Sequence, residues 1–229
     1  MKSVLISGAD RGVGLGLAAE FASHGWRVFA GQFMPEWPQL SELKEKYPDN
    51  LVIVPLDVSS SESVRAAREL VGRETDRIDL LASNAGIGHL KEDRESMTRV
   101  FSVNSLALVR LVSSFRDLLD RGDRRVCAVS SEAGSITLAM RPDMYSYCMS
   151  KTALNMELRL LFNELRPQGY TFRVYHPGWV RSYMSGKKST VGYFEPEETA
   201  AVAYRQFTED REVEDVLYLM DIEGEVWAF

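Results

Sequence analysis

Short apolar runs rich in β-branched residues alternate with longer segments of helical periodicity along the chain. The apolar runs have the length of buried strands and cover residues 4–7, 27–31, 51–56, 78–83, 125–130, 171–176 and 216–220. Helical periodicity covers residues 13–24, 37–47, 60–74, 94–120, 144–166 and 196–209. This alternation predicts an α/β fold, a Rossmann-like doubly wound sheet of seven parallel strands with helices on both faces. Ligands of such a sheet bind at the carboxyl ends of the strands.

Length and composition narrow the class of protein. The chain has 229 residues, of which 45% are hydrophobic and 26% charged, which favours one domain over residues 1–229 rather than two small ones. A net charge of −6 without a basic run argues against nucleic acid or a membrane surface, so we expect a small-molecule partner. Cys127 and Cys148 form no disulfide framework, and no Cys/His cluster has metal-ligand spacing. We therefore expect a cytoplasmic protein without a metal site.

A glycine-rich turn joins the first predicted strand to the first predicted helix. Its residues are Ser7, Gly8, Ala9, Asp10, Arg11, Gly12, Val13 and Gly14. Glycines here let backbone N–H groups approach a pyrophosphate at the helix N-terminus, where the helix dipole favours an anion. A tight turn without a ligand is the alternative. Gly16, inside the helix, is interpreted as a close-packing residue.

Tyr147 and Lys151 stand four residues apart in the predicted helix 144–166, so they share one face. A nearby ammonium favours the phenolate, and lowering the pKa of tyrosine by about three units from about 10 needs about 4 kcal/mol. Such a pair can transfer a proton near neutral pH, although the same spacing also occurs on ordinary helix surfaces. Tyr145 is no rival, because Met149 stands four residues after it.

Four further segments complete a pattern. They are Ser83-Asn84-Ala85-Gly86 after the fourth strand, Val103-Asn104 in the fourth helix, Ser130-Ser131 at the end of the fifth strand, and Pro177-Gly178 after the sixth. Together with the glycine turn and the Tyr/Lys pair, their order and spacing resemble the short-chain dehydrogenase/reductase family over essentially the whole chain. Residues 131–135 and the short C-terminal region resemble its carbonyl-reductase branch, which includes sniffer and C-factor proteins.

The resemblance implies a set of catalytic residues. Tyr147 would be the proton donor, Lys151 would lower its pKa and hold the nicotinamide ribose, and Ser131 would hydrogen-bond the substrate carbonyl. Asn104 would hold a water that connects Lys151 to solvent, and Ser135 is a weaker candidate for the role of Ser131. Hydride would move between nicotinamide and a carbonyl or alcohol carbon while Tyr147 transfers the proton.

The resemblance also implies a dinucleotide site. In the glycine turn its residues are Ser7, Gly8, Asp10, Arg11, Gly12, Val13 and Gly14. Elsewhere they are Asp57 and Val58 at the adenine, Asn84, Ala85 and Gly86 on the adenosine side, Pro177, Gly178, Val180 and Ser182 toward the carboxamide, and Tyr147 with Lys151.

Charge near the second predicted strand bears on the choice of dinucleotide. An NAD site usually has an acid about 20 residues beyond the glycines, to bind the ribose 2′-hydroxyl. Residues 30–33 contain no acid, whereas Arg11 could meet a 2′-phosphate. We therefore favour NADP(H) over NAD(H), although no Lys or Arg follows the second strand.

The helix 144–166 has two apolar stripes on roughly opposite sides. Met149, Ala153, Met156 and Leu160 form one stripe, and Leu154, Leu158, Leu161 and Leu165 form the other. Because only one stripe can pack on the sheet, we predict a homodimer through this helix, with a loop-covered monomer as the alternative.

Substrate choice stays open at this point. The loops 87–95, 132–146 and 181–195 are expected to form the pocket, which Met140, Trp179, Tyr183 and Met184 would make apolar unless they pack a lid. The fold does not fix the substrate. A nucleotide-binding sensor or signalling protein with little or no turnover is the alternative function on the same fold.

Overall fold

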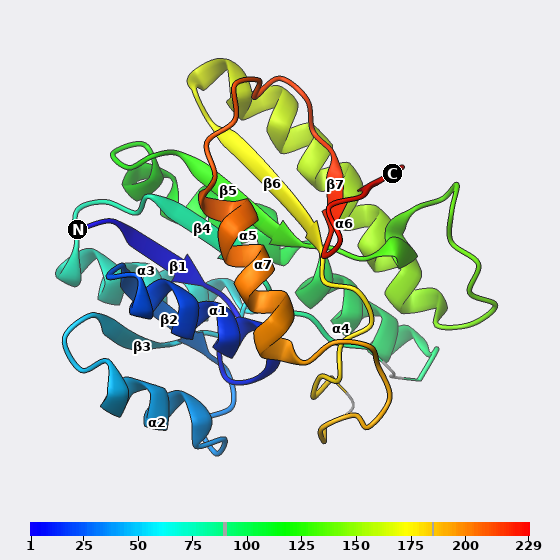
Figure 1. The fold of residues 1–229 in the computed structure, drawn as a ribbon, viewed down its shortest axis with the longest axis horizontal. Coiled ribbons are helices and arrows are strands. Elements are labelled where there is room, and N and C mark those ends of the chain that lie inside the picture. The colour runs from blue at the N-terminus through cyan, green and yellow to red at the C-terminus, as the bar shows by residue number, and fades with distance from the viewer. Residues whose placement is uncertain (89–90, 185) are drawn as a thin grey trace.

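The computed structural model describes residues 1–88, 91–184 and 186–229, which form an eight-stranded sheet with helices on both faces (Figure 1). The strands are β1 (Ser3–Ile6), β2 (Arg27–Gln32), β3 (Leu51–Pro55), β4 (Leu80–Ser83), β5 (Arg125–Val129), β6 (Thr171–His176), β7 (Leu219–Asp221) and β8 (Val226–Trp227). Their order is β3-β2-β1-β4-β5-β6-β7-β8, and all neighbours are parallel except β7 and β8. The chain thus builds outward from β1 to β3 and then returns to β4 on the other side of β1.

This reversal of direction beside β1 confirms the predicted Rossmann-like, doubly wound sheet and places a ligand crevice at the ends of β1 and β4. The predicted count of seven strands, all parallel, is wrong. The C-terminal residues turn back after β7 and pair with it as the antiparallel β8. The Asp221 carboxylate fixes this hairpin by accepting hydrogen bonds from Trp227 Nε1 (2.8 Å) and from the backbone N–H of Glu223 (2.9 Å).

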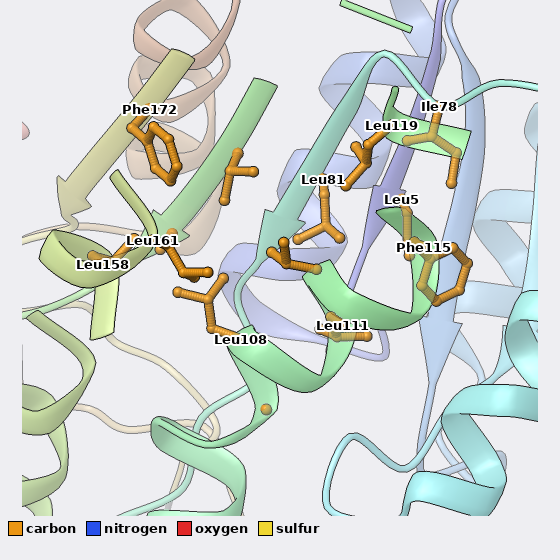
Figure 2. Packing of buried hydrophobic residues seen from close by; sticks show 14 of the residues in the cluster. Leu5, Ile78, Leu81, Leu108, Leu111, Phe115, Leu119, Leu158, Leu161 and Phe172 are labelled. Carbon is orange, nitrogen blue, oxygen red and sulfur yellow. The ribbon is translucent and has the colours of Figure 1, made fainter. Parts of the chain in front are cut away.

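The helices separate into two layers (Figure 1). They are α1 (Gly12–Ser23), α2 (Gln39–Lys46), α3 (Ser61–Glu74), α4 (Arg94–Asn104), α5 (Ala107–Leu119), α6 (Tyr145–Leu165) and α7 (Pro196–Thr208), with the short 3₁₀ helices η1 (Glu132–Gly134) and η2 (Arg166–Gln168). Helices α1, α2 and α7 bury their apolar residues on one face of the sheet, and α3, α5 and α6 on the other. Figure 2 shows the core between the sheet and helices α3, α5 and α6. In this core Leu5 and Leu81 of the sheet lie near Leu111 and Phe115 of α5.

The predicted helix 94–120 is two helices in the structure. The backbone leaves helical geometry at Ser105 (φ −122°, ψ −71°). The N–H groups of Ser105 and Leu106 both donate to the carbonyl of Phe101, at 3.1 Å each. Because the apolar spacing continues through this turn, periodicity alone predicted one continuous helix. Within the described ranges, no helix combines the length and apolar character needed to cross a bilayer.

Candidate functional site

A cleft with a volume of about 1470 Å³ lies where β1, β2, β4, β5 and β6 end. The predicted site residues that line it are Gly8, Asp10, Arg11, Gly12, Val13, Asp57, Val58, Asn84, Ala85, Gly86, Ser131, Tyr147, Lys151, Pro177, Gly178, Val180 and Ser182. The glycine turn and the Tyr147/Lys151 pair therefore share one cavity, although more than 130 residues of chain separate them. Ser7, Gly14 and Asn104 do not line the cleft, and neither does Ser135, the weaker candidate for the role of Ser131.

The glycine turn is packed too closely at Gly8 and Gly14 to hold a side chain. A Cβ atom on Gly14 would lie 2.0 Å from the carbonyl oxygen of Gly8, and one on Gly8 would lie 2.8 Å from Cα of Ala85. Arg11, the N-cap of α1, makes no side-chain cap hydrogen bond, and the first turn holds no acid. The first N–H groups of α1 thus have no side-chain acceptor at the cap, which fits the pyrophosphate of a dinucleotide.

Hydrogen bonds between Ser7 and Asn84 hold the glycine turn in place. The Ser7 hydroxyl accepts hydrogen bonds from the backbone N–H groups of Asn84 (3.0 Å) and Ala85 (3.1 Å). In return, Asn84 Nδ2 donates to the carbonyls of Ser7 (3.1 Å) and Gly8 (2.9 Å). These bonds join the ends of β1 and β4. Ser7 therefore shapes the cleft without facing it.

Asp10 and Arg11 of the glycine turn contact the residues that follow β2. Asp10 Oδ1 accepts from the N–H groups of Phe33 (2.9 Å) and Met34 (3.1 Å), and burial raises the pKa of this carboxyl. The Arg11 guanidinium stacks on the Trp37 ring at 4.6 Å from its centroid, and its Nη1 lies 2.8 Å from Met34 Sδ. As the sequence indicated, the residue after β2 is apolar rather than acidic.

Lys151 is buried in the cleft wall, and Tyr147 beside it is half-buried. Lys151 Nζ donates to the carbonyl of Val129 (2.9 Å) and lies 5.9 Å from the centroid of the Tyr147 ring. Burial lowers the pKa of Lys151 to about 8. Burial also raises the pKa of Tyr147 to about 12, although the Ser131 hydroxyl opposes that rise. The predicted lowering of the Tyr147 pKa is thus not found, because desolvation disfavours the phenolate more than its neighbours stabilise it.

Asn104 joins three elements. Its Oδ1 accepts from the N–H of Ile87 (2.8 Å), and its Nδ2 donates to the carbonyl of Ile87 (2.8 Å) and to Ser150 Oγ (3.0 Å). These bonds tie the end of α4 to the loop after β4 and to α6. The water-holding role implied for Asn104 stays a prediction.

Ser131 reaches the same cavity through a close contact between η1 and α6. A Cβ atom on Gly134 would lie 2.7 Å from Asn155 Nδ2 and 2.8 Å from the carbonyl oxygen of Lys151, so the absence of a side chain permits this approach. Asn155 Nδ2 also donates to the carbonyl of Gly134 (3.2 Å). The long segment between Ser131 and Tyr147 therefore does not keep the two residues apart.

Among the polar residues of the cleft that had no role assigned from the sequence are Glu132, Arg141 and His176. Arg141 Nε donates to Glu132 Oε1 (3.0 Å), and His176 Nε2 lies 3.5 Å from Glu132 Oε2. Glu132 directly follows Ser131, which could have drawn attention to it. Arg141 lies in an irregular loop, and no periodic or motif signal marks it.

The outer part of the cleft is aromatic. Trp179, Tyr183 and Met184 line it, as predicted, and Tyr193 packs edge-on against Trp179 at 5.4 Å between ring centroids. Met140 does not line the cleft and is 94% exposed, so its predicted place in the pocket is wrong. Residues 89–90 and 185 of the predicted substrate loops lie outside the described residues. In the described part of the chain, no group of three or more His, Cys, Asp or Glu residues could hold a metal ion.

Comparison with known proteins now decides the family. Residues 2–191 match the model of the family described as short chain dehydrogenase. The chain belongs to this family. It is 37% identical over 123 residues to C-signal of Myxococcus xanthus, covering 51% of this chain and 74% of that protein.

Two solved structures of carbonyl reductases share the fold of this short-chain dehydrogenase. The NADPH-bound carbonyl reductase from chicken fatty liver is 30% identical, with a TM-score of 0.88 over 100% of this chain and 99% of that chain. The carbonyl reductase Sniffer of D. melanogaster shares the fold at 21% identity, with a TM-score of 0.87 over 100% of both chains. The resemblance drawn from the sequence motifs is confirmed.

The two predicted stripes on α6 of this short-chain dehydrogenase are in different environments. The stripe of Leu154, Leu158, Leu161 and Leu165 is buried in the core. In the other stripe, Met149, Met156 and Leu160 are 50%, 60% and 61% exposed. One face of α6 therefore packs on the sheet, and the opposite face is apolar and exposed.

Proposed function

We propose that this short-chain dehydrogenase transfers hydride between NADP(H) and a carbonyl or alcohol substrate, with Tyr147 moving the proton. The observation that carries this proposal is the shared cleft, in which Tyr147 and Ser131 face the same cavity as the glycine turn. The similarity to an NADPH-bound carbonyl reductase over the whole chain supports the same chemistry.

Each residue has a distinct part in this proposal. The nicotinamide, when bound, supplies or accepts the hydride. Tyr147 is protonated at neutral pH because burial raises its pKa to about 12, so it can donate to the substrate oxygen. Lys151, with its pKa lowered to about 8 by burial, is largely charged at pH 7 and stabilises the Tyr147 anion after the proton has left.

The preference for NADP(H) rests on Arg11. Its guanidinium lines the cleft and is held against Trp37, and residues 30–33 at the end of β2 contain no acid. We expect Arg11→Ala to weaken NADPH binding by about 10-fold to 100-fold, the value of a charge-assisted hydrogen bond, and to leave NADH binding unchanged. Titration of both dinucleotides by fluorescence measures this. Equal or tighter binding of NADH by the wild type would refute the preference.

A homodimer and a cytoplasmic location are further parts of the proposal. The exposed apolar face of α6 supports the dimer. Leu106, the N-cap of α5, and Val109 of α5 are also 51% and 39% exposed. The free thiols of Cys127 and Cys148 support a reducing compartment.

A pair of tyrosine variants tests the activity. We expect Tyr147→Phe to lose a factor of about 10² to 10⁴ in turnover of a panel of ketones and aldehydes while keeping its NADPH affinity. Tyr145→Phe is the matched control, because Tyr145 is on the same helix, 64% exposed and outside the cleft lining. If the wild type and Tyr147→Phe are equally inert yet bind the nucleotide, the sensor function becomes the better account.

A further inference from the structure

A contact between two aromatic rings joins the loops that follow β6 and β2. Tyr183, in the loop after β6, packs edge-on against Trp37, in the loop after β2, with 5.2 Å between the ring centroids. The two strands are not neighbours, because β1, β4 and β5 lie between them in the sheet. Four spacings of about 4.8 Å separate β6 from β2, so the loop covers about 19 Å. It therefore crosses the strand ends at which the cleft lies.

The base of this loop is fixed independently of Trp37. Arg181 Nε donates to Glu195 Oε1, and Arg181 Nη1 donates to the carbonyl of Gly192, at 2.5 Å each. Tyr183 is only two residues beyond Arg181. Removing the ring contact between Tyr183 and Trp37 should therefore free the outer part of the loop and leave its base and the fold intact.

Trp37 also contacts the glycine turn. The Arg11 guanidinium lies 4.6 Å from the centroid of the Trp37 ring, an arrangement in which the π-electrons of the indole attract the cation. Arg11 and Tyr183 both line the cleft, whereas Trp37 is outside the cleft lining. Trp37 is thus the common partner of a cation in the glycine turn and of an aromatic ring that comes from the opposite side of the cleft.

We propose that Trp37 is a positioning residue of the dinucleotide site: it holds Tyr183 across the cleft as a clasp over the bound dinucleotide, and it orients Arg11 toward the 2′-phosphate. The proposal rests on the function proposed above, because it takes NADP(H) as the ligand. The glycine turn and the loop after β6 are the parts of the site assigned to the pyrophosphate and to the carboxamide. A dinucleotide that reaches both must extend under this loop, so the clasp must open before the dinucleotide can leave.

Release of NADPH tests the clasp directly. Tyr183→Ala removes the ring that Trp37 holds, so we expect NADPH to leave about threefold to tenfold faster than from the wild type, the range of one aromatic pair. Tyr183→Phe is the matched control, because it keeps the ring and should release NADPH at the wild-type rate. Stopped-flow mixing of the NADPH complex with excess NADP⁺ measures the rate through the fluorescence of NADPH.

A fragment of the dinucleotide separates the clasp from a general loosening of the site. Adenosine 2′,5′-bisphosphate carries the 2′-phosphate but has no nicotinamide half, so it does not extend under Tyr183. Tyr183→Ala should therefore keep the wild-type affinity for this fragment in calorimetric titration. Trp37→Ala should weaken the affinity by about threefold or more, because Arg11 loses its support. A loss of structure alone would weaken binding of the fragment to both variants.

The double variant Trp37→Ala/Tyr183→Ala shows whether the two rings act together. Because Tyr183 has no ring to contact once Trp37 is removed, the double variant should release NADPH at the rate of Trp37→Ala, within about a factor of two. If the two single effects multiply, Tyr183 retains the dinucleotide by itself and the clasp is refuted. Release from Tyr183→Ala at the wild-type rate refutes it as well.

The outcomes separate the clasp from the proposed function. If the release rates follow the expected pattern but the wild type reduces no carbonyl and oxidises no alcohol, the oxidoreductase function fails and the clasp stands. If the wild type reduces a ketone with NADPH but Tyr183→Ala releases NADPH no faster, the clasp alone fails. A wild type that binds no NADPH overturns both.

Discussion

Two helical glycines offer a test of how the glycine turn is built. Gly14 lies in the first turn of α1, and Gly72 lies in the last turn of α3. An alanine is favoured over glycine within a helix by about 0.5–1 kcal/mol. The surroundings of the added methyl group therefore decide whether each substitution raises or lowers the free energy of unfolding.

The two surroundings differ in what can move. At Gly14 the new Cβ would lie 2.0 Å from the carbonyl oxygen of Gly8, which also accepts a hydrogen bond from Asn84 Nδ2 (2.9 Å). At Gly72 it would lie 2.2 Å from Nη1 of Arg68, the far end of a flexible side chain. Overpacking against fixed groups costs about 1–3 kcal/mol, so we expect Gly14→Ala to lose about 2 kcal/mol of unfolding free energy after the helical gain.

Urea unfolding and NADPH titration measure both effects. Gly14→Ala displaces the Gly8 carbonyl within the turn, so we expect NADPH affinity to fall by about tenfold or more, the equivalent of about 1.4 kcal/mol. Gly72→Ala should keep its NADPH affinity and be as stable as the wild type or slightly more stable. If Gly14→Ala keeps both the stability and the NADPH affinity of the wild type, the close approach of Gly14 to the Gly8 carbonyl does not shape the dinucleotide site.

Two other predictions concern Lys151 and the exposed face of α6. Burial lowers the pKa of Lys151 to about 8, against about 10.4 in an unfolded chain. Between about pH 8 and 10.4 the unfolded chain therefore binds more protons than the folded protein does. The free energy of unfolding rises with pH over this range, by about 3 kcal/mol in all. Lys151→Met should remove this rise in urea unfolding between pH 8 and 10, and an identical slope in both proteins would contradict it. For the dimer, Leu160→Glu should give a monomer in light scattering, whereas the control Ile136→Glu, at a position that is 80% exposed and outside α6, should not. A wild type that is monomeric at micromolar concentration would exclude the dimer.

Elements whose burial follows a regular period could be predicted from the sequence. The limits of α3 differ from the predicted 60–74 by one residue, and those of α6 from 144–166 by one at each end. Gly16, interpreted as a close-packing residue, has room for no side chain, because its Cβ would lie 2.6 Å from Cβ of Ala200 in α7. Each of these features follows from local spacing or from one motif.

Features that depend on irregular loops or on the surroundings of a side chain in the folded protein could not be predicted. The end of α4 is fixed by the hydrogen bonds of Asn104 to Ile87, and β8 forms because Asp221 binds the backbone that follows it. Glu132 and Arg141 meet across a loop without periodicity. The pKa of Tyr147 likewise depends on its burial in the folded chain, which the spacing to Lys151 does not reveal.

Transfer of a labelled hydride tests the central claim most directly. We would supply NADPH that carries deuterium at the transferable position of the nicotinamide and analyse the alcohol formed from an accepted ketone by mass spectrometry. The account predicts one deuterium on the carbinol carbon with the wild type, and a rate lower by at least about 10² with Tyr147→Phe at unchanged NADPH affinity. Product without deuterium, or equal rates for the two proteins, would contradict it.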